Sequence, residues 1–230
     1  MGAPQGFFQI VFSGGIVGVL IVLTLLALSL LMVYLVVEQL LTLRRGELMP
    51  GDVSEQVREM LRQGRANDAM TLCRNRPSLL SFVLANGLAE IEGGWSEVEK
   101  ALEEALAEQS ARLMRRIEYL SVIGNIAPMI GLLGTVTGMI FAFQRVAMSQ
   151  GAAGAPELAE GIYQALITTV GGLIVAIPSL ASFAVFRNRL DQFTAEAAYL
   201  AQHAFAPLKR RKRPVRSQPP KEPPRSRGGA

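Results

Sequence analysis

Long uncharged stretches are the feature that most constrains the fold of this chain. Residues 1–37, 119–144 and 161–186 contain no Asp, Glu, Lys, Arg or His. An α-helix rises about 1.5 Å per residue, so about 20 apolar residues cross the hydrocarbon core of a bilayer. Each stretch is long enough to do so. The sequence therefore predicts an all-α membrane protein with three transmembrane helices.

The basic residues predict the orientation of these spans. Residues 44–118 hold eleven Lys or Arg and residues 187–230 another eleven, whereas the connection between the second and third spans holds only Arg145. Because basic segments stay in the cytoplasm, we expect the N-terminus outside and the C-terminus inside. A cleaved signal peptide is the alternative for the first stretch. It needs a basic start and a small-residue cleavage site, and neither is present, so we expect a retained span.

The pattern predicts how the chain is divided. The predicted segments are an outer N-terminus (1–15), a first transmembrane helix (16–43), a cytoplasmic helical domain (44–118), a second transmembrane helix (119–144), an outer loop (145–160), a third transmembrane helix (161–186), a cytoplasmic helical extension (187–206) and a disordered basic tail (207–230).

Apolar residues at helical spacing predict the elements of the cytoplasmic part. We expect short helices near residues 52–63, 66–74 and 79–91. Ser96 is the expected N-cap of a continuous helix that runs from about 96 to 143. The third span is expected to continue past Phe186 to about Leu200 as part of the same helix. The cytoplasmic portion is then built largely from extensions of the spans.

Composition excludes most soluble enzyme chemistry. Cys73 and His203 are the single cysteine and histidine, and neither has metal-ligand spacing. There is no phosphate-binding or dinucleotide-binding glycine motif. We therefore predict a protein that is not an enzyme and has no metal or cofactor. The basic run Lys209–Arg213 suits an anchor to anionic lipids better than a nucleic-acid contact.

The second and third uncharged stretches also carry small and polar residues. Small residues allow close helix packing in lipid, and hydroxyls can bond across helices. A packing role is one interpretation of the glycines, and a kink or a helix end is the expected role of the prolines. Polar groups at membrane depth usually face a bundle interior or a water-filled cavity, so we predict pore-facing roles for the threonines and the glutamine. The candidates for an ion pathway are Thr135, Thr169, Thr168 and Gln164, and those for helix packing and pore lining are Pro128, Gly131, Gly134, Gly138, Gly172 and Pro178.

Two segments resemble a known family. The segment 127–140, APMIGLLGTVTGMI, resembles the second-span signature of the ExbB/TolQ/MotA proton-channel family, and the segment 161–178, GIYQALITTVGGLIVAIP, resembles its third-span signature. The cytoplasmic helices, notably residues 101–105, are also similar. The resemblance covers about residues 15–206. Three spans fit the ExbB/TolQ branch better than the four-span flagellar branch.

The resemblance implies a mechanism. Family members form a ring, typically a homopentamer, in the bacterial inner membrane, and their second and third spans line a central pore. The pore holds an ExbD- or TolR-like single-span partner with a membrane Asp, and a TonB- or TolA-like protein carries force across the periplasm. Thr135 and Thr169 match the two pore threonines. Because the uncharged spans hold no Asp, Glu, Lys, Arg or His of their own, the partner would supply the proton carrier.

Gln164 departs from the family pattern, because ExbB and TolQ carry Glu at the matching position. An amide does not titrate. Thr168 beside Thr169 adds an oxygen that would suit Na⁺, although H⁺ is the default ion. The leading hypothesis is an ion-driven motor subunit. The alternatives are a non-conducting ring scaffold and a protein that tethers lipid or nucleic acid through its basic tail.

Overall fold

The structure is a computed structural model that describes residues 15–148 and 155–211. All regular elements of these residues are helical, which confirms the all-α prediction. They are α2 (Gly15–Thr42), α3 (Arg45–Leu48), α4 (Val53–Arg62), α5 (Ala66–Asn75), α6 (Leu79–Ala89), the 3₁₀ turn η1 (Ile91–Gly93), α7 (Trp95–Met148), α8 (Ala155–Ala204) and α9 (Ala206–Arg211). By length and composition, α2, α7 and α8 are each able to cross a membrane.

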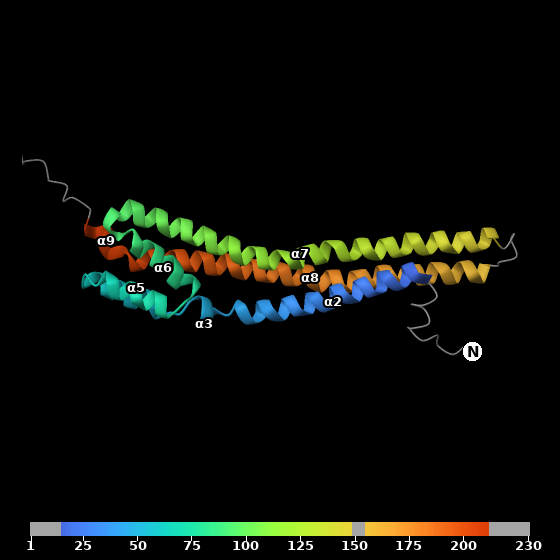
Figure 1. Cartoon of the computed structure of the whole chain (residues 1–230), viewed down its shortest axis with the longest axis horizontal. Helices are drawn as coiled ribbons and strands as arrows, with labels where there is room; N and C mark the ends of the chain where they lie inside the picture. Colours follow the sequence, from blue (N-terminus) through green and yellow to red (C-terminus); the bar gives the residue numbers. More distant parts are fainter. Residues whose placement is uncertain (1–14, 149–154, 212–230) are drawn as a thin grey trace, which may run out of the picture. The chain divides into compact units, whose positions relative to one another are not determined.

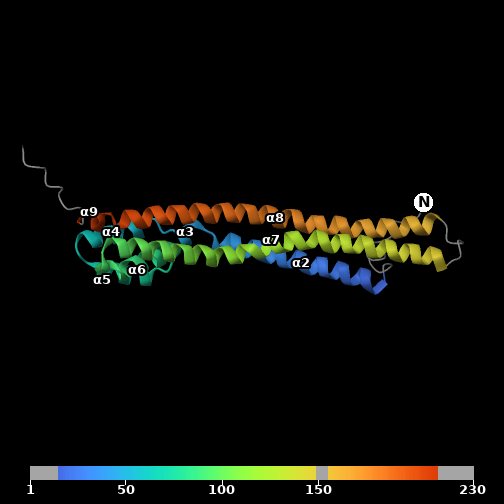
Figure 2. The same ribbon diagram turned by 90° about the horizontal axis from the view of Figure 1, so that it is seen from above.

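The described residues form two compact units. Unit 1 contains those up to Leu48 and those in Glu108–Ala195, and unit 2 contains Met49–Ala107 and those from Glu196 onwards. In unit 1, α2 lies beside α7 and α8 (Figures 1 and 2). Most large apolar side chains of α2 are exposed, including Leu20, Leu23 and Leu30. Apolar side chains exposed on a helix of this length are typical of contact with lipid.

The two long helices extend further than the predicted spans. α7 continues to Met148 and α8 begins at Ala155, so both ends of the predicted loop 145–160 are helical. Residues 145–148 contain no Gly or Pro to end α7, and proline is tolerated in a first helical turn such as the one at Pro156. The two helices are joined by 149–154, which lie outside the described residues.

The start of α7 also differs from the prediction. The helix begins at Trp95, so Ser96 is not its N-cap. Gly94, directly before it, has φ +87°, a conformation that residues with a Cβ rarely adopt. This glycine conformation sets the first residue of the helix. Local N-cap chemistry alone does not give this boundary.

Helix α6 is the centre of unit 2. Its Leu80, Val83 and Leu84 are completely buried. A Cβ at Gly87 would lie 2.7 Å from Leu102 of α7 and 3.0 Å from Phe205. The short helix therefore fits closely against two other parts of the unit because one of its positions has no side chain.

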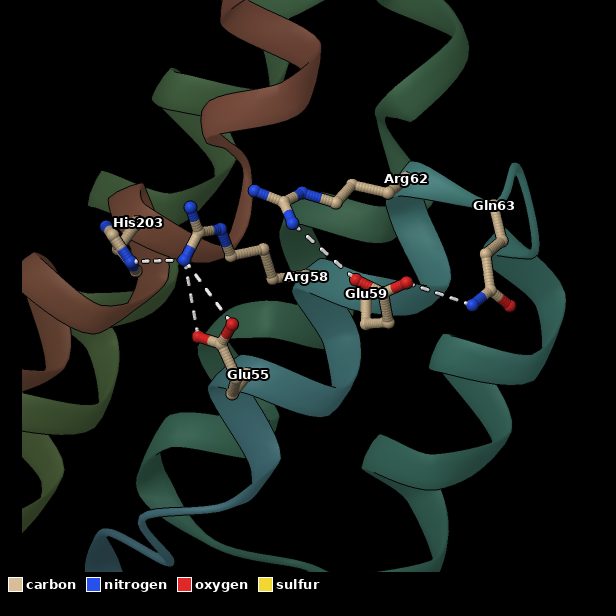
Figure 3. A network of polar contacts seen from close by, with 6 residues as sticks. All are labelled: Glu55, Arg58, Glu59, Arg62, Gln63 and His203. Atoms are coloured by element: carbon tan, nitrogen blue, oxygen red, sulfur yellow. Dashed lines mark hydrogen bonds and ion pairs between the residues drawn. The ribbon is translucent and has the colours of Figure 1, made fainter.

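A polar contact joins α4 to the end of α8 in unit 2 (Figure 3). Arg58 Nη1 lies 2.7 Å from His203 Nε2, and it also lies 3.4 Å from each carboxylate oxygen of Glu55. A guanidinium group only donates hydrogen bonds, so His203 Nε2 must accept. Tyr199 stacks on the His203 ring, with 6.1 Å between centroids.

The predicted disorder from residue 207 onwards is wrong for the first part of the tail. Residues 206–211 form α9, and Lys209 Nζ lies 4.9 Å from the centroid of the Trp95 ring. A cation over an indole face is attracted by the ring electrons, which helps to hold this turn in place. The remaining tail residues, 212–230, lie outside the described residues.

Candidate functional site

The backbones of α7 and α8 touch within unit 1, because glycines lie at the contact. A Cβ at Gly172 would lie 2.5 Å from the Ala127 carbonyl oxygen, and a Cβ at Gly131 would lie 2.8 Å from the Thr168 carbonyl oxygen. At Gly138, the added atom would lie 2.8 Å from the Ala165 Cβ. Small residues permit this kind of approach in lipid. The structure therefore places these three predicted packing glycines between the two helices.

Two adjacent threonines of α8 bind one carbonyl of α7. Thr168 Oγ1 and Thr169 Oγ1 each lie 3.1 Å from the Gly131 carbonyl oxygen. Thr168 Oγ1 also lies 2.7 Å from the carbonyl oxygen of Ala165 in its own helix, and its side chain packs against Gly134. We call the Gly131 carbonyl and the two hydroxyls the Gly131 contact. It joins two of the predicted pathway residues to a predicted packing residue.

Thr135 lies one helical turn beyond Gly131 on α7. Its side chain is 8% exposed in the single chain, and its Oγ1 donates to the Leu132 carbonyl oxygen at 2.7 Å. A threonine commonly satisfies its hydroxyl in this way inside a helix. The hydroxyl proton is therefore already bonded, and the oxygen lone pairs are what Thr135 has left to offer a ligand.

Gln164 lies one turn from Thr168 on α8, and its Nε2 donates to Glu160 Oε1 at 3.1 Å. Gln164 and Thr168 line one cavity of about 70 Å³ together with Thr137 of α7, whereas Thr135 and Thr169 do not line it. The predicted pathway residues are thus divided between this cavity and the Gly131 contact, with Thr168 at both.

The prolines do not end the helices, although a helix end was one of their two expected roles. Pro128 lies inside α7 and Pro178 inside α8. Each removes one backbone donor, and neighbouring groups in a bundle make such positions tolerable in membrane helices. Ser179, which follows Pro178, is completely buried and donates to the Leu120 carbonyl oxygen of α7 at 2.7 Å.

Sequence reasoning did not select Thr137 and Ser179 as site residues. Both are hydroxyl residues in uncharged stretches, which is the signal that selected Thr135 and Thr169. The structure singles them out because Ser179 bonds to the Leu120 carbonyl oxygen of α7 and Thr137 lines the cavity. Both features depend on how the helices align. Among the described residues, no group of three or more His, Cys, Asp or Glu side chains is placed to hold a metal ion.

These features define a helical membrane protein with three candidate spans, two of which pack backbone to backbone through glycines and hydroxyls. A family model described as the MotA/TolQ/ExbB proton channel family matches residues 75–198. The chain belongs to this family, which confirms the resemblance seen in its two motifs.

Individual relatives agree with this assignment. The chain is 32% identical over 178 residues to the ExbB-like 3 protein of Synechocystis sp., covering 76% of this chain and 82% of that protein. It is 33% identical over 135 residues to an ExbB homolog of Methanothermobacter thermautotrophicus, covering 59% and 47%. It is 32% identical over 112 residues to the biopolymer transport protein ExbB of Salmonella typhimurium, covering 49% and 46%. The chain thus spans about half the length of the latter two.

Proposed function

We propose that this chain is the ion-channel subunit of a motor in the bacterial inner membrane. It assembles as a homopentameric ring and works with an ExbD/TolR-like single-span partner that carries a membrane Asp. The proton motive force then drives work in the cell envelope, with a TonB/TolA-like protein transmitting force across the periplasm. Its N-terminus is periplasmic and its C-terminus cytoplasmic, as the distribution of basic residues predicts. Family membership and the three candidate spans support this proposal.

The observation that carries the proposal is the combination of hydroxyls and missing charges in α7 and α8. Between Glu118 and Arg145, and between Glu160 and Arg187, neither helix has an Asp, Glu, Lys, Arg or His side chain. The threonines of the Gly131 contact nevertheless lie within these stretches. Hydroxyl oxygens can solvate a charge but cannot carry a proton at neutral pH, so the carboxylate of a partner is required.

H⁺ is the proposed ion, and Na⁺ is the alternative. Thr169 Oγ1 donates to the Gly131 carbonyl oxygen, and Thr168 Oγ1 shares its one proton between that oxygen and the Ala165 carbonyl oxygen. A sodium site needs oxygen lone pairs directed at one point, whereas the Gly131 oxygen already accepts hydrogen bonds. Flux that persists when Na⁺ is replaced by K⁺ would support H⁺.

A non-conducting scaffold is the second candidate, and Gln164 is the observation that favours it. The resemblance to ExbB and TolQ leads us to expect a titratable Glu at position 164. The chain instead has an amide there, which donates a hydrogen bond to Glu160. A ring that only holds partner helices would not need that Glu.

Deletion of 212–230 separately tests the tethering role of the basic tail, because a motor does not need those residues for flux.

The test is ion flux in proteoliposomes that contain this chain and its single-span partner. We compare the intact protein with Thr135→Ala/Thr169→Ala and with the control Thr24→Ala. Thr24 lies on α2, and its hydroxyl bonds the Leu20 carbonyl of its own helix at 2.8 Å. We expect the double variant to lose at least about tenfold in flux, about 1.4 kcal/mol on the barrier, with the control unchanged.

Assembly must be measured on the same samples. Native mass determination gives the number of copies in the complex, and five copies with the partner bound are expected in all three proteins. Equal flux in the double variant would remove the threonines from the pathway. An assembled intact complex without any flux would favour the scaffold. Rescue by Thr169→Ser, which restores the hydroxyl, would show that the oxygen and not side-chain volume matters.

A further inference from the structure

A cavity lies between α2, α7 and α8 in unit 1. Two proposed pathway residues, Gln164 and Thr168, line it, but the proposed function gives the space itself no role. Its volume is about 70 Å³. Gly18 of α2, Gly138 of α7 and Gly161 of α8 line it, so missing side chains create the space. Arg145 and Gly161 place it toward the ends of α7 and α8 that precede and follow 149–154.

Three polar side chains interrupt the mainly apolar lining of this cavity, which includes Ile21, Val22 and Phe141. Thr137, Gln164 and Thr168 line it, at membrane depth in otherwise apolar helices. Empty protein cavities are apolar, whereas polar cavities hold water that bonds to the groups around it. One water needs only about 10–15 Å³ of such space. The cavity therefore has room and partners for several water molecules.

The hydrogen bonds already made leave acceptors for that water. Thr137 Oγ1 donates to the Leu133 carbonyl oxygen at 2.8 Å, and Thr168 Oγ1 shares its one proton between the carbonyl oxygens of Ala165 and Gly131, at 2.7 and 3.1 Å. With their protons engaged, both hydroxyl oxygens keep lone pairs that can accept from water. The amide nitrogen of Gln164 bonds to Glu160, so its carbonyl oxygen is a third acceptor.

We propose that this cavity is a hydrated vestibule through which ions from the outer side reach the Gly131 contact inside each chain. Thr168 lines the cavity and also binds the Gly131 carbonyl, to which Thr169 donates from the next position. Water at Thr168 is thus one residue from the proposed pore threonine. This inference rests on the proposed function and gives α2 a part in it, because Gly18, Ile21 and Val22 of α2 line the cavity.

The first test measures water access without relying on flux. In a Cys73→Ala background, Thr137→Cys is exposed from the outer side to a charged, membrane-impermeant thiol reagent in the intact complex. Ala27→Cys, at an exposed position of α2, is the lipid-facing control. Only a hydrated thiol forms the reactive thiolate readily, so Thr137→Cys should react at least about tenfold faster than the control.

A filling variant makes the test specific to the cavity. Gly18→Leu places a side chain at the α2 wall, and Ala27→Leu adds similar bulk on the exposed part of the same helix. Gly18→Leu should slow labelling of Thr137→Cys by about tenfold and reduce flux, whereas Ala27→Leu should change neither. Both leucine variants must retain the assembly of the intact complex.

The outcomes separate this inference from the proposed function. The vestibule would be overturned if Thr137→Cys is labelled no faster than Ala27→Cys. It would also be overturned if Thr137→Cys reacts rapidly with an apolar maleimide but not with the charged reagent, because that result indicates lipid in the cavity. Normal flux in Gly18→Leu, with flux lost in Thr135→Ala/Thr169→Ala, would overturn the vestibule and leave the motor intact. Absent flux in the intact protein would reject the motor, while labelling would still report on hydration.

Discussion

Adding one methyl group at Gly172 should force α7 and α8 apart. A Cβ there would lie 2.5 Å from the Ala127 carbonyl oxygen, 3.2 Å from its carbon and 3.3 Å from the Gly131 Cα, and all three are backbone atoms. No side-chain rotation relieves such contacts, so the helices must separate locally by about 1 Å to reach normal contact distances. The same movement would stretch the 3.1 Å bonds of Thr168 and Thr169 to Gly131 beyond hydrogen-bonding range.

The expected cost follows from three terms. Overpacking a well-fitted contact costs about 1–3 kcal/mol, and each interhelical hydrogen bond lost in a membrane costs about 0.6 kcal/mol. Replacing Gly by Ala inside a helix returns up to about 1 kcal/mol. Gly172→Ala should therefore destabilise the protein by about 2 kcal/mol, which lowers the unfolding midpoint by about 4–8 °C for a chain of this size.

The adjacent glycine is a matched control. A Cβ at Gly171 would meet only Leu25 Cδ1, at 3.7 Å, which is an ordinary contact. Gly171→Ala should leave stability unchanged or raise it by up to about 1 kcal/mol. The assay is thermal unfolding of both purified variants in one detergent. If Gly172→Ala unfolds at or above the midpoint of Gly171→Ala, the inferred backbone contact between α7 and α8 is wrong.

Three further predictions concern unit 2. Phe205→Ala removes a completely buried side chain that packs against Gly87 and should lower the free energy of unfolding by about 3–5 kcal/mol. Limited proteolysis of residues 49–107 should then be faster. Cleavage no faster than in the exposed-site variant Tyr199→Ala would contradict this. Burial raises the pKa of Cys73 to about 11 from an ordinary 9.0, so a thiol reagent at pH 8 should label this cysteine only after unfolding. The stability that the neutral thiol contributes is complete below pH 9 and should fall as the pH rises toward 11. A hydrogen bond from Arg76 lowers the pKa of Asp52, so its stabilising contribution is present above pH 3.8 and is lost as the pH falls further; Asp52→Asn should make acid unfolding less steep, and identical acid profiles would refute this.

The elements that the sequence predicts well are those set by composition over many residues. A run of about 20 residues without charge has few uses other than crossing a membrane, and 119–144 and 161–186 both lie within helices long enough to do so. The short helices near 52–63 and 66–74 are also found, as Val53–Arg62 and Ala66–Asn75. Their apolar faces and the glycine and proline residues between them are local signals.

The features that the sequence does not predict depend on distant parts of the chain. The partner of Thr169 is a carbonyl 38 positions away, and that of Arg58 is an imidazole 145 positions away. Such pairs follow from how helices align after packing, and spacing within one helix carries no information about it. The boundary at Trp95 was missed for a different reason, because it depends on the backbone conformation of Gly94.

The close fit of α7 and α8 in unit 1 has a mechanical consequence. Gly138 faces Ala165, Gly131 faces Thr168, and Gly124 faces Leu180. The two helices are therefore antiparallel, with close contacts along their length. Sliding one helix by a single residue, or turning it, would press a Cβ against backbone at several places at once. Within unit 1, the two helices therefore form one rigid pair that does not slide or rotate internally. In the proposed motor, movement would therefore occur where this pair meets another surface and not between α7 and α8.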